Sequence, residues 1–150
     1  MRPFVGVCLS IWLIFGQIGV VFAADKIGQV KVSSGDVTIL RDGQAIQVEA
    51  GTELFEKDVI KTGENSAVGM TFSDNSRVSL GPKSELSLET YAFQKPGKPD
   101  SFEARLQNGS LTAASGKISK SRPLAMRVLT PTTVLGVKGT EFAVRVSAEG

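Results

Sequence analysis

From residue 35 onward, apolar and polar positions alternate with a period of two. Seven short runs show it: Val37 and Ile39; Ile46 and Val48; Val68, Met70 and Phe72; Val78 and Leu80; Leu86 and Leu88; Phe102, Ala104 and Leu106; and Phe142, Val144 and Val146. Successive side chains of a β-strand point to opposite faces, so each run predicts a strand with one face on a core and the other in water. After the first two dozen residues, no stretch keeps a helical spacing of apolar residues for three turns, so we expect almost no helix.

Turn-forming residues separate these runs. They occur at Asp42-Gly43, Asp74-Asn75-Ser76, Gly81-Pro82, Asn108-Gly109 and Lys138-Gly139. Their spacing leaves about five to eight residues for each strand, which is typical of a small all-β sandwich, barrel or stacked-hairpin domain. Residues 94–100 contain two prolines and a glycine, and because proline cannot donate to a ladder, they predict a solvated loop.

The first 23 residues differ from the rest of the chain. Met1-Arg2 precedes an apolar run from Phe4 to Phe22, and small residues follow at Ala23-Ala24. A positive start, an apolar centre and small residues at the end are typical of a secretory signal peptide, with cleavage after Ala23 and a mature domain of residues 24–150. The alternative is an uncleaved membrane anchor, because the run is close to the ~20 residues that a spanning helix needs.

The composition of the mature domain excludes several kinds of chemistry. Cys8 lies in the leader and the chain has no histidine, so the mature domain contains neither residue. Structural disulfides, thiol catalysis, zinc sites and histidine general bases are therefore excluded. Ser84 and Ser110 have no base pattern to activate them, and the carboxylates are spread singly without a calcium-loop spacing. We expect no enzymatic activity, no cofactor and no bound metal.

The charges of the mature domain nearly balance. Without Arg2 there are 16 basic and 15 acidic residues, with no long run of one sign. This balance argues against a nucleic-acid partner and against binding to an anionic membrane surface. Glu103 and Arg105 alternate with an apolar run, and we interpret them as members of solvated cross-strand pairs.

Residues 130–144, "TPTTVLGVKGTEFAV", resemble a phosphate-binding loop at first reading. A P-loop, however, needs lysine directly after its second glycine and a helix beyond it, whereas Lys138 precedes Gly139. The stretch also contains the Gly-x-x-Gly of RNA-binding KH loops, but those loops join two helices, and the flanks here favour strands. We interpret the stretch as a strand ending at its Thr-Pro start, a turn over residues 136–140, and a strand that returns to the core.

Two ordered motifs and the turn between them resemble the FecR-type periplasmic domain, a family named from the regulator of ferric citrate uptake. The resemblance spans about residues 35–146, and the residues that carry it are Asp58, Ile60, Thr62 and Gly63, then Asp74 and Ser76, then Thr130, Pro131, Gly136, Lys138, Gly139, Thr140 and Phe142. Lys57 stands where the family usually has the glycine of a Gly-Asp pair, and Asn75 replaces the glycine of Asp-Gly-Ser. Asparagine tolerates left-handed backbone geometry nearly as well as glycine, so we expect that turn to be retained.

The resemblance implies a fold and a role. The fold is all-β, with short antiparallel strands in a solenoid-like stack or distorted sandwich, and the motif residues are structural. In the best-known members the domain passes a signal from an outer-membrane receptor, through a membrane helix, to a cytoplasmic segment that controls a sigma factor. This chain has no room before its apolar run for such a segment. We therefore expect a non-enzymatic periplasmic or secreted module for protein interaction or signal sensing, with an unknown protein partner in the envelope.

Two further hypotheses remain open from the sequence. The first is an envelope structural or glycan-binding protein, in which Tyr91 and Phe93 stack on sugar if they are exposed; the other interpretation places both in the core. The second is a membrane-anchored regulator that faces the periplasm from the inner membrane with its N-terminal helix uncleaved. The chain also ends near the point where the family commonly continues with another strand. We expect either a short member of the family or a last strand that lacks a partner within the chain and has an edge open to another protein.

Overall fold

The computed structural model describes residue 19 and residues 24–139 and 141–147. Apart from Gly19, the predicted signal segment lies outside these ranges, as do residue 140 and residues 148–150. The regular elements of the described part are strands with a single exception: β1 (Lys26–Ser34), β2 (Val37–Arg41), β3 (Gln44–Gln47), β4 (Glu53–Phe55), β5 (Val59–Thr62), β6 (Ala67–Phe72), β7 (Arg77–Leu80), β8 (Glu85–Ala92), β9 (Ser101–Ala114), β10 (Met126–Leu129), β11 (Val134–Val137) and β12 (Glu141–Val146). The four-residue α1 (Ile118–Ser121) follows β9.

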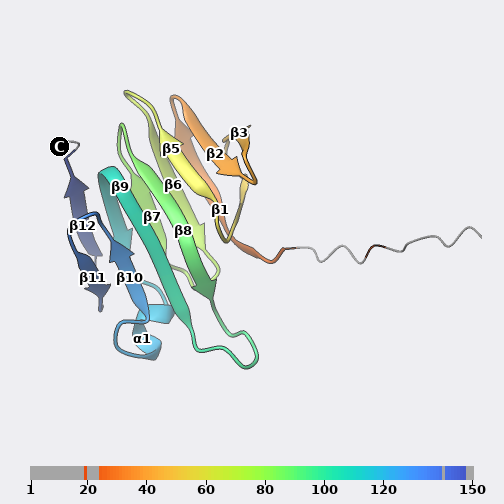
Figure 1. Ribbon diagram of the computed structural model, residues 1–150, viewed down its shortest axis with the longest axis vertical. Helices are drawn as coiled ribbons and strands as arrows, with labels where there is room; N and C mark the ends of the chain where they lie inside the picture. The colour runs from red at the N-terminus through yellow and green to blue at the C-terminus, as the bar shows by residue number, and fades with distance from the viewer. Residues whose placement is uncertain (1–18, 20–23, 140, 148–150) are drawn as a thin grey trace, which may run out of the picture.

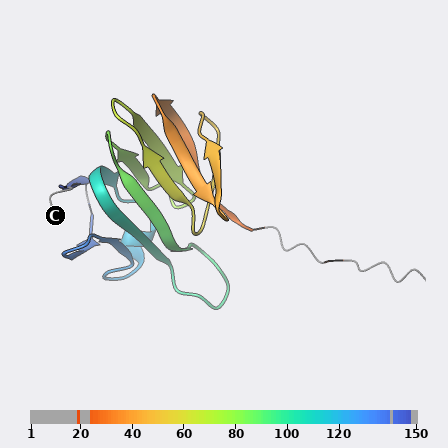
Figure 2. The same ribbon diagram turned by 45° about the horizontal axis from the view of Figure 1, so that its top comes forward.

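These strands form one continuous sheet that curls into a half-barrel (Figures 1 and 2). The strand order is β3-β2-β5-β8-β9-β7-β6-β1-β4, and β10, β11 and β12 attach through β9. The pairings are antiparallel except for that of β9 with β10. The predicted all-β class with antiparallel strands is confirmed, while the single curled sheet differs from both a solenoid-like stack and two separate layers.

Strand β9 joins the two halves of the sheet. Its first half pairs with β8 and β10, and its second half, from Gly109, pairs with β7 and β12. The turn predicted at Asn108-Gly109 is therefore wrong, because the strand bends there without reversing. Gly109 has a φ of 93°, and a Cβ at this position would overlap Ser84, so only glycine fits the bend. An Asn-Gly pair supplies positive φ equally to a hairpin turn and to a strand bend.

The core lies inside the curl and consists mainly of the alternating residues of the predicted runs. Val68, Met70 and Phe72 on β6 are all buried, and so are their counterparts on β2, β7, β8 and β9. The rings of Phe72 and Phe102 meet edge to face at 4.7 Å between centroids, which adds to the burial of apolar area. The apolar residues of β3 and β12 are only half-buried because these strands lie at edges of the sheet.

The C-terminal stretch folds differently from the predicted strand, turn and returning strand. β10 ends at Leu129 and a turn over 130–133 leads into β11, which confirms the strand end at Thr130-Pro131. Gly136, predicted in the next turn, instead lies inside β11 opposite Arg127. β11 pairs with β10, whereas β12 crosses to β9, so the two strands joined at Lys138-Gly139 are not hairpin partners. Period two predicts where strands lie, but it does not say which strands are neighbours.

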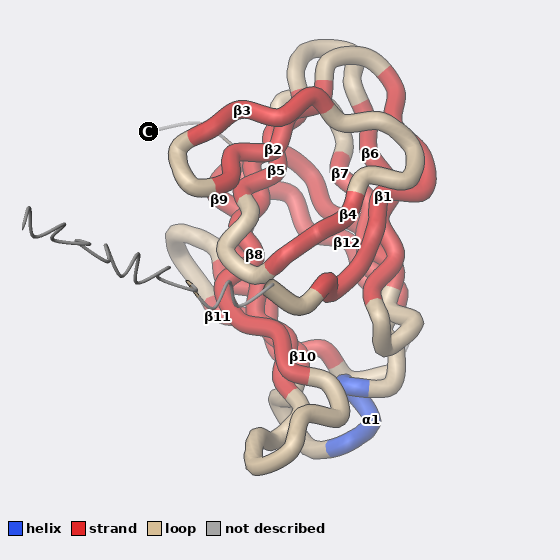
Figure 3. Tube along the Cα trace, turned by 90° about the vertical axis from the view of Figure 1, so that its right-hand side faces the viewer, coloured by secondary structure: helices blue, strands red, loops and turns tan. Residues whose placement is uncertain are grey.

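The helix α1 and the hairpin β10–β11 lie together at one end of the molecule (Figure 3). The loop predicted over residues 94–100 connects β8 to β9, as expected. In the described ranges no helix is long and apolar enough to cross a membrane.

Candidate functional site

The first motif places a buried carboxylate between β2 and β4. Asp58 has a side chain that is only 1% exposed, and it accepts hydrogen bonds from Nε and Nη2 of Arg41, at 2.8 and 2.7 Å, and from the main-chain N of Phe55 at 2.9 Å. The Arg41 guanidinium also stacks on the Phe55 ring, 4.5 Å from its centroid. The hydrogen bond to Asp58 raises the pKa of Arg41 against the opposing effect of burial. The pair therefore fastens β2 and β4 to the turn before β5, and three of the roughly four acceptor positions of the carboxylate are used within the fold.

Lys57, the departure from the family pattern, explains why glycine is usual at this position. Its φ is 75°, in the left-handed region, and its main-chain N donates to Leu88 O at 2.8 Å. The turn before β5 thus needs a backbone geometry that costs a residue with a Cβ about 1–2 kcal/mol.

We expect Lys57→Gly to stabilise the fold by about 1 kcal/mol, because glycine adopts this geometry without the steric penalty. The Lys57 Nζ bond to Glu89 O is solvent-exposed and its loss costs little. The measurement is the free energy of unfolding in urea. Lys31→Gly, at an exposed position of β1, is the matched control and should lose about 0.5–1 kcal/mol; equal losses in both variants would contradict the strain at residue 57.

Thr62 and Gly63 close the end of β5 against the turn between β7 and β8. The Thr62 hydroxyl donates to Gly81 O at 2.6 Å and accepts from Ser84 N at 2.9 Å. Gly63 N donates to Asp36 O at 2.9 Å. The Ser84 hydroxyl in turn accepts from Ser110 N at 3.0 Å and donates to Gly81 O at 2.9 Å. Of the two serines considered as nucleophiles, Ser84 uses its hydroxyl in this internal network, and Ser110 joins it through its main-chain N and O.

The turn between β6 and β7 contains a second buried carboxylate. Asp74 is 0% exposed, and its carboxyl oxygens accept from Ser76 N, Ser76 Oγ, the Tyr91 hydroxyl and Ile118 N, at 3.2, 2.6, 3.0 and 3.2 Å. Its main-chain oxygen also accepts from Lys117 N at 2.8 Å. Asn75 has a φ of 69°, so asparagine does occupy the left-handed position of the usual glycine. Asp74 thereby fastens the segment that carries α1 to the body of the sheet.

Tyr91 is a core residue and cannot stack on a sugar. It is 3% exposed, its ring packs on Phe72 and Phe102, and its hydroxyl accepts from Asp74 N at 2.9 Å. Phe93 is half-buried and also packs against the core. The stacking platform considered from the sequence is therefore not present on these two residues. Burial, and secondarily the neighbouring Asp74, raise the pKa of Tyr91 well above its ordinary value.

This shift predicts a loss of stability at alkaline pH. The folded state holds the Tyr91 proton more tightly than the unfolded state, so its contribution is complete below a pH of about 10 and falls as the pH rises further. The expected slope is about 1.4 kcal/mol per pH unit above that point. Urea unfolding between pH 8 and 11 measures it. In Tyr91→Phe this slope should disappear, and an unchanged slope would contradict the assignment.

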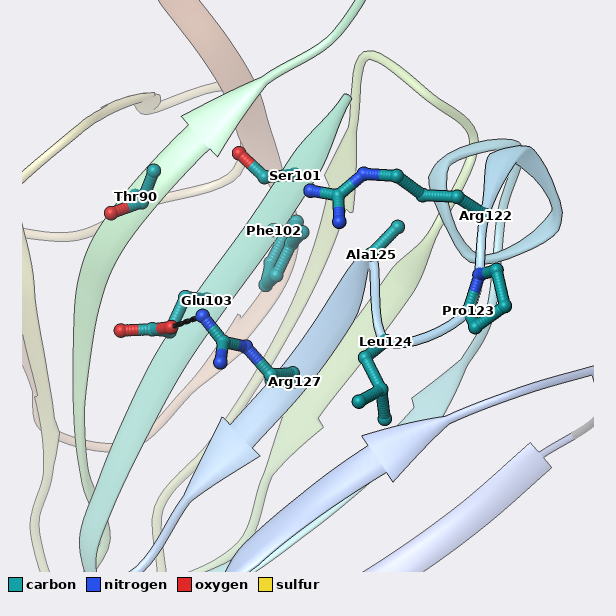
Figure 4. Close-up of a pocket in the computed structure, with 9 residues that line it drawn as sticks. All are labelled: Thr90, Ser101, Phe102, Glu103, Arg122, Pro123, Leu124, Ala125 and Arg127. Atoms are coloured by element: carbon teal, nitrogen blue, oxygen red, sulfur yellow. Dashed lines mark hydrogen bonds and ion pairs between the residues drawn. The ribbon is translucent and has the colours of Figure 1, made fainter. Parts of the chain in front are cut away.

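The corner formed by α1, the turn 122–125 and β10–β11 is hollowed on two sides. One cavity, of about 340 Å³, lies between the outer face of β9 and residues 122–125, as Figure 4 shows. Arg127 and Glu103 form an ion pair across it. The second hollow, of about 430 Å³, is lined by residues 119–123 together with Lys138 and Gly139. Arg122 borders both cavities, and none of the described residues that line the second is acidic.

The family comparison decides what kind of domain this is. The sequence profile described as "FecR protein" matches residues 58–150, which is more than half of the chain. The chain belongs to the FecR family. Neither a curated protein nor a solved structure gives a significant match.

The matched FecR region begins at Asp58 and includes every strand from β5 onward. The four earlier strands lie outside the match and complete the half-barrel, since β2 pairs with β5 and β1 pairs with β6. Ile60 is fully buried on β5, and Ser76 is buried beside Asp74. The residues of the first FecR motif and of the turn after it thus lie mainly inside the fold.

The residues of the last FecR motif are spread along the C-terminal part. The Thr130 hydroxyl accepts from Thr133 N at 3.1 Å and holds the turn that contains the exposed Pro131. Lys138 is exposed, Gly139 has a φ of 94°, and Phe142 is half-buried on β12. Thr140 lies outside the described residues. The described residues of this motif do not converge on one point, and among them only Lys138 and Gly139 border the second hollow.

The sequence pattern missed the corner of this FecR domain altogether. Its main members are Leu124 and Arg122, which stand in an irregular segment between two strands. The available signal was the Pro123-Leu124 pair, in which leucine follows proline where a turn with positive φ usually has glycine. The solvated pairs predicted for Glu103 and Arg105 do occur, with Arg127 and Glu89 as partners. Within the described ranges, no three residues of metal-binding type gather at one place.

Proposed function

We propose that this FecR-family chain is a non-enzymatic, periplasmic module of envelope signalling that works by binding another protein. Family membership carries this proposal, because FecR domains belong to signalling systems of the envelope. In this role the half-barrel serves as a rigid frame, and its outer surface binds the partner protein. A link to a sigma factor would then run through that partner.

The internal use of the polar motif residues supports this role. The side chains of these motif residues form hydrogen bonds with other parts of the fold, as seen for Asp58, Asp74 and Thr62. Catalysis needs a group that is positioned yet free to exchange a proton or attack a substrate, and these three are committed to the fold. The side chains left for contact with other molecules are those of the outer surface.

Gene deletion and complementation test the proposal. Transcript levels are compared in the host, the deletion strain and a strain that expresses the full chain again. We expect a defined set of envelope-related transcripts to change on deletion and to recover on complementation. The destabilised variant Asp74→Ala should restore them less than the unaltered chain does. If no transcript changes while the purified chain is retained on peptidoglycan, the glycan-binding alternative would replace this proposal.

The location of the chain needs its own measurement. We propose cleavage after Ala23, and the mass of the protein recovered from the periplasmic fraction distinguishes a chain of residues 24–150 from the full chain. Recovery of the full-length mass in the inner-membrane fraction would instead favour the anchored regulator. Both outcomes are compatible with a binding role, so this measurement decides only where that role is performed.

A further inference from the structure

We propose that the corner of α1, the turn 122–125 and β11 binds an acidic, extended segment of a partner protein, which adds as a strand to β11. This inference rests on the proposed function, since it names the chemistry of the partner. Four observations carry it: a strained and exposed leucine, an apolar strip beside it, an unpaired strand edge, and a group of cations without acidic partners.

Leu124 is held in a costly conformation that presents its side chain to solvent. Its φ is 59°, and the turn around it is closed by a hydrogen bond from Ala125 N to Arg122 O at 3.3 Å. A residue with a Cβ costs about 1–2 kcal/mol in this region of backbone space, and glycine would avoid the cost. The side chain is nevertheless 62% exposed. A leucine in this position is unfavourable for the backbone and contributes little to the core. We therefore infer that Leu124 contacts another molecule.

An apolar strip extends from Leu124 along the outer face of β11. A Cβ at Gly136 would collide with Cδ2 of Leu124, so the missing side chain of this motif glycine is what allows the leucine to lie across the strand. Val134, two residues earlier on the same face, is 57% exposed. Leu124 and Val134 are two of only three large hydrophobic side chains classed as exposed in the described part of the chain.

β11 has one free edge in the described structure, because its only pairing there is with β10. The unpaired N–H and C=O groups of an edge strand are a template for another extended chain, and natural edges are usually protected by charge, proline or a cover. The four residues of β11 could pair with a segment of similar length. Its side chains would alternate between the apolar strip and the opposite face.

The charge around this edge selects an acidic segment. Lys120, Arg122 and Lys138 line the second hollow, and the other lining residues that the structure describes carry no negative charge. None of these three forms an ion pair within the described residues, whereas Arg127 is already paired with Glu103. Glu141, which is close in sequence, borders a different hollow beside Arg77. A second copy of this chain paired through β11 would bring two such cationic groups together, so like-charge repulsion opposes that occupant.

A direct binding measurement with designed peptides tests the proposal. The probe is a labelled, end-capped eight-residue peptide in which valine and threonine alternate with glutamate, and fluorescence anisotropy follows its binding to the purified full chain. One control peptide has glutamine for every glutamate, and another has N-methyl groups on alternate amides. We expect weaker binding of both controls, by about tenfold or more, because the first lacks the charge and the second cannot pair with an edge.

Variants of the chain separate a contact role from a structural role. Leu124→Gly should raise the melting temperature, because it removes backbone strain, and yet weaken peptide binding by about tenfold or more. Gly136→Ala should displace Leu124 and weaken binding with little change in stability. Arg122→Gln and Lys138→Gln should weaken binding and reduce its salt dependence. Lys98→Gln, on the exposed loop between β8 and β9, is the matched control and should leave binding unchanged.

Peptide binding that is unaffected by Leu124→Gly and by Arg122→Gln would overturn the assignment of this corner. Equal binding of the N-methylated peptide would overturn strand addition, and dimerisation through β11 in place of peptide binding would replace the acidic partner by a second copy.

The complementation experiment separates the two proposals. If Leu124→Gly restores the transcripts fully, the signalling role stands and the corner is wrong as its contact site. If deletion changes no transcript while the peptide binds as described, the signalling role falls and the binding site remains.

Discussion

Replacing Asp74 by alanine is expected to lower the free energy of unfolding by about 4 kcal/mol, which is a large part of the stability of a small domain. The substitution leaves four buried donor groups without their acceptor: the main-chain N and hydroxyl of Ser76, the Tyr91 hydroxyl and the main-chain N of Ile118. Each buried donor that loses its partner costs about 1–3 kcal/mol. The turn between β6 and β7 and the segment leading to α1 should therefore loosen together.

Urea unfolding followed by circular dichroism measures this loss. Asp74→Asn keeps one carbonyl oxygen and the shape of the side chain, so it should lose roughly half as much as alanine. Asn75→Gly, in the same turn but with a backbone φ of 69°, is the control and should leave stability unchanged or slightly higher. A loss below about 1 kcal/mol for Asp74→Ala would show that water replaces the missing oxygens, and the cluster would then not fasten the α1 segment.

Replacing Arg41 by methionine is expected to cost about 3–5 kcal/mol, because it leaves the Asp58 carboxylate buried without its counter-charge. Methionine retains apolar contact with the Phe55 ring, so most of the loss comes from the charge and not from packing. Asp58→Asn should cost less, since the amide oxygen still accepts from Phe55 N. Unfolding in urea gives each value.

The double variant, Arg41→Met with Asp58→Asn, separates the interaction between these two side chains from the contacts that each makes with other residues. If the two side chains act mainly on one another, its loss should be clearly smaller than the sum of the single losses. The exposed pair Lys61 with Glu85 is the control, at 3.5 Å, and Lys61→Met should change stability by less than about 1 kcal/mol. Additive losses for Arg41 and Asp58 would mean that each acts through other neighbours.

The strands of this domain were largely predictable because burial of one face imposes period two. Val68, Met70 and Phe72 were placed on one face of a strand, and all three are buried on β6. The family pattern added the positions with special backbone geometry, since Lys57 and Asn75 both take the positive φ that the usual glycine implies. At both positions the turn requires a positive φ, and this requirement also explains why the family usually has glycine there.

Neighbour relations between strands were not predictable in the same way. The alternation around Phe142 predicts a strand, yet nothing local says that β12 pairs with β9 and not with β11. Asn108-Gly109 likewise predicts positive φ without saying whether the chain reverses or bends. A strand pairs with whichever sheet edge remains available after the rest of the sheet has formed. The local sequence of the strand does not show which edge that is.

The candidate contact surface was invisible to the pattern for a different reason. Leu124 interrupts no apolar period, and Arg122 has no fixed spacing from Lys138, because the fold brings these residues together through an irregular turn and the end of β11. Binding surfaces often combine residues from separate elements, and their signal is a local conflict such as an exposed, strained leucine. Only the backbone angles and the exposure of the side chain reveal that conflict.

Strand β9 determines when the other strands can complete their pairing during synthesis. A chain made from its N-terminus presents β7 and β8 well before β9 exists, and each of them finds its second neighbour only in β9. Until residue 114 has emerged, two strand edges next to apolar faces stay open to mispairing with other chains. β10 and β12 then require β9 in turn. A holding chaperone that recognises extended apolar segments should therefore matter most between the synthesis of β7 and that of residue 114, and little once β9 is in place.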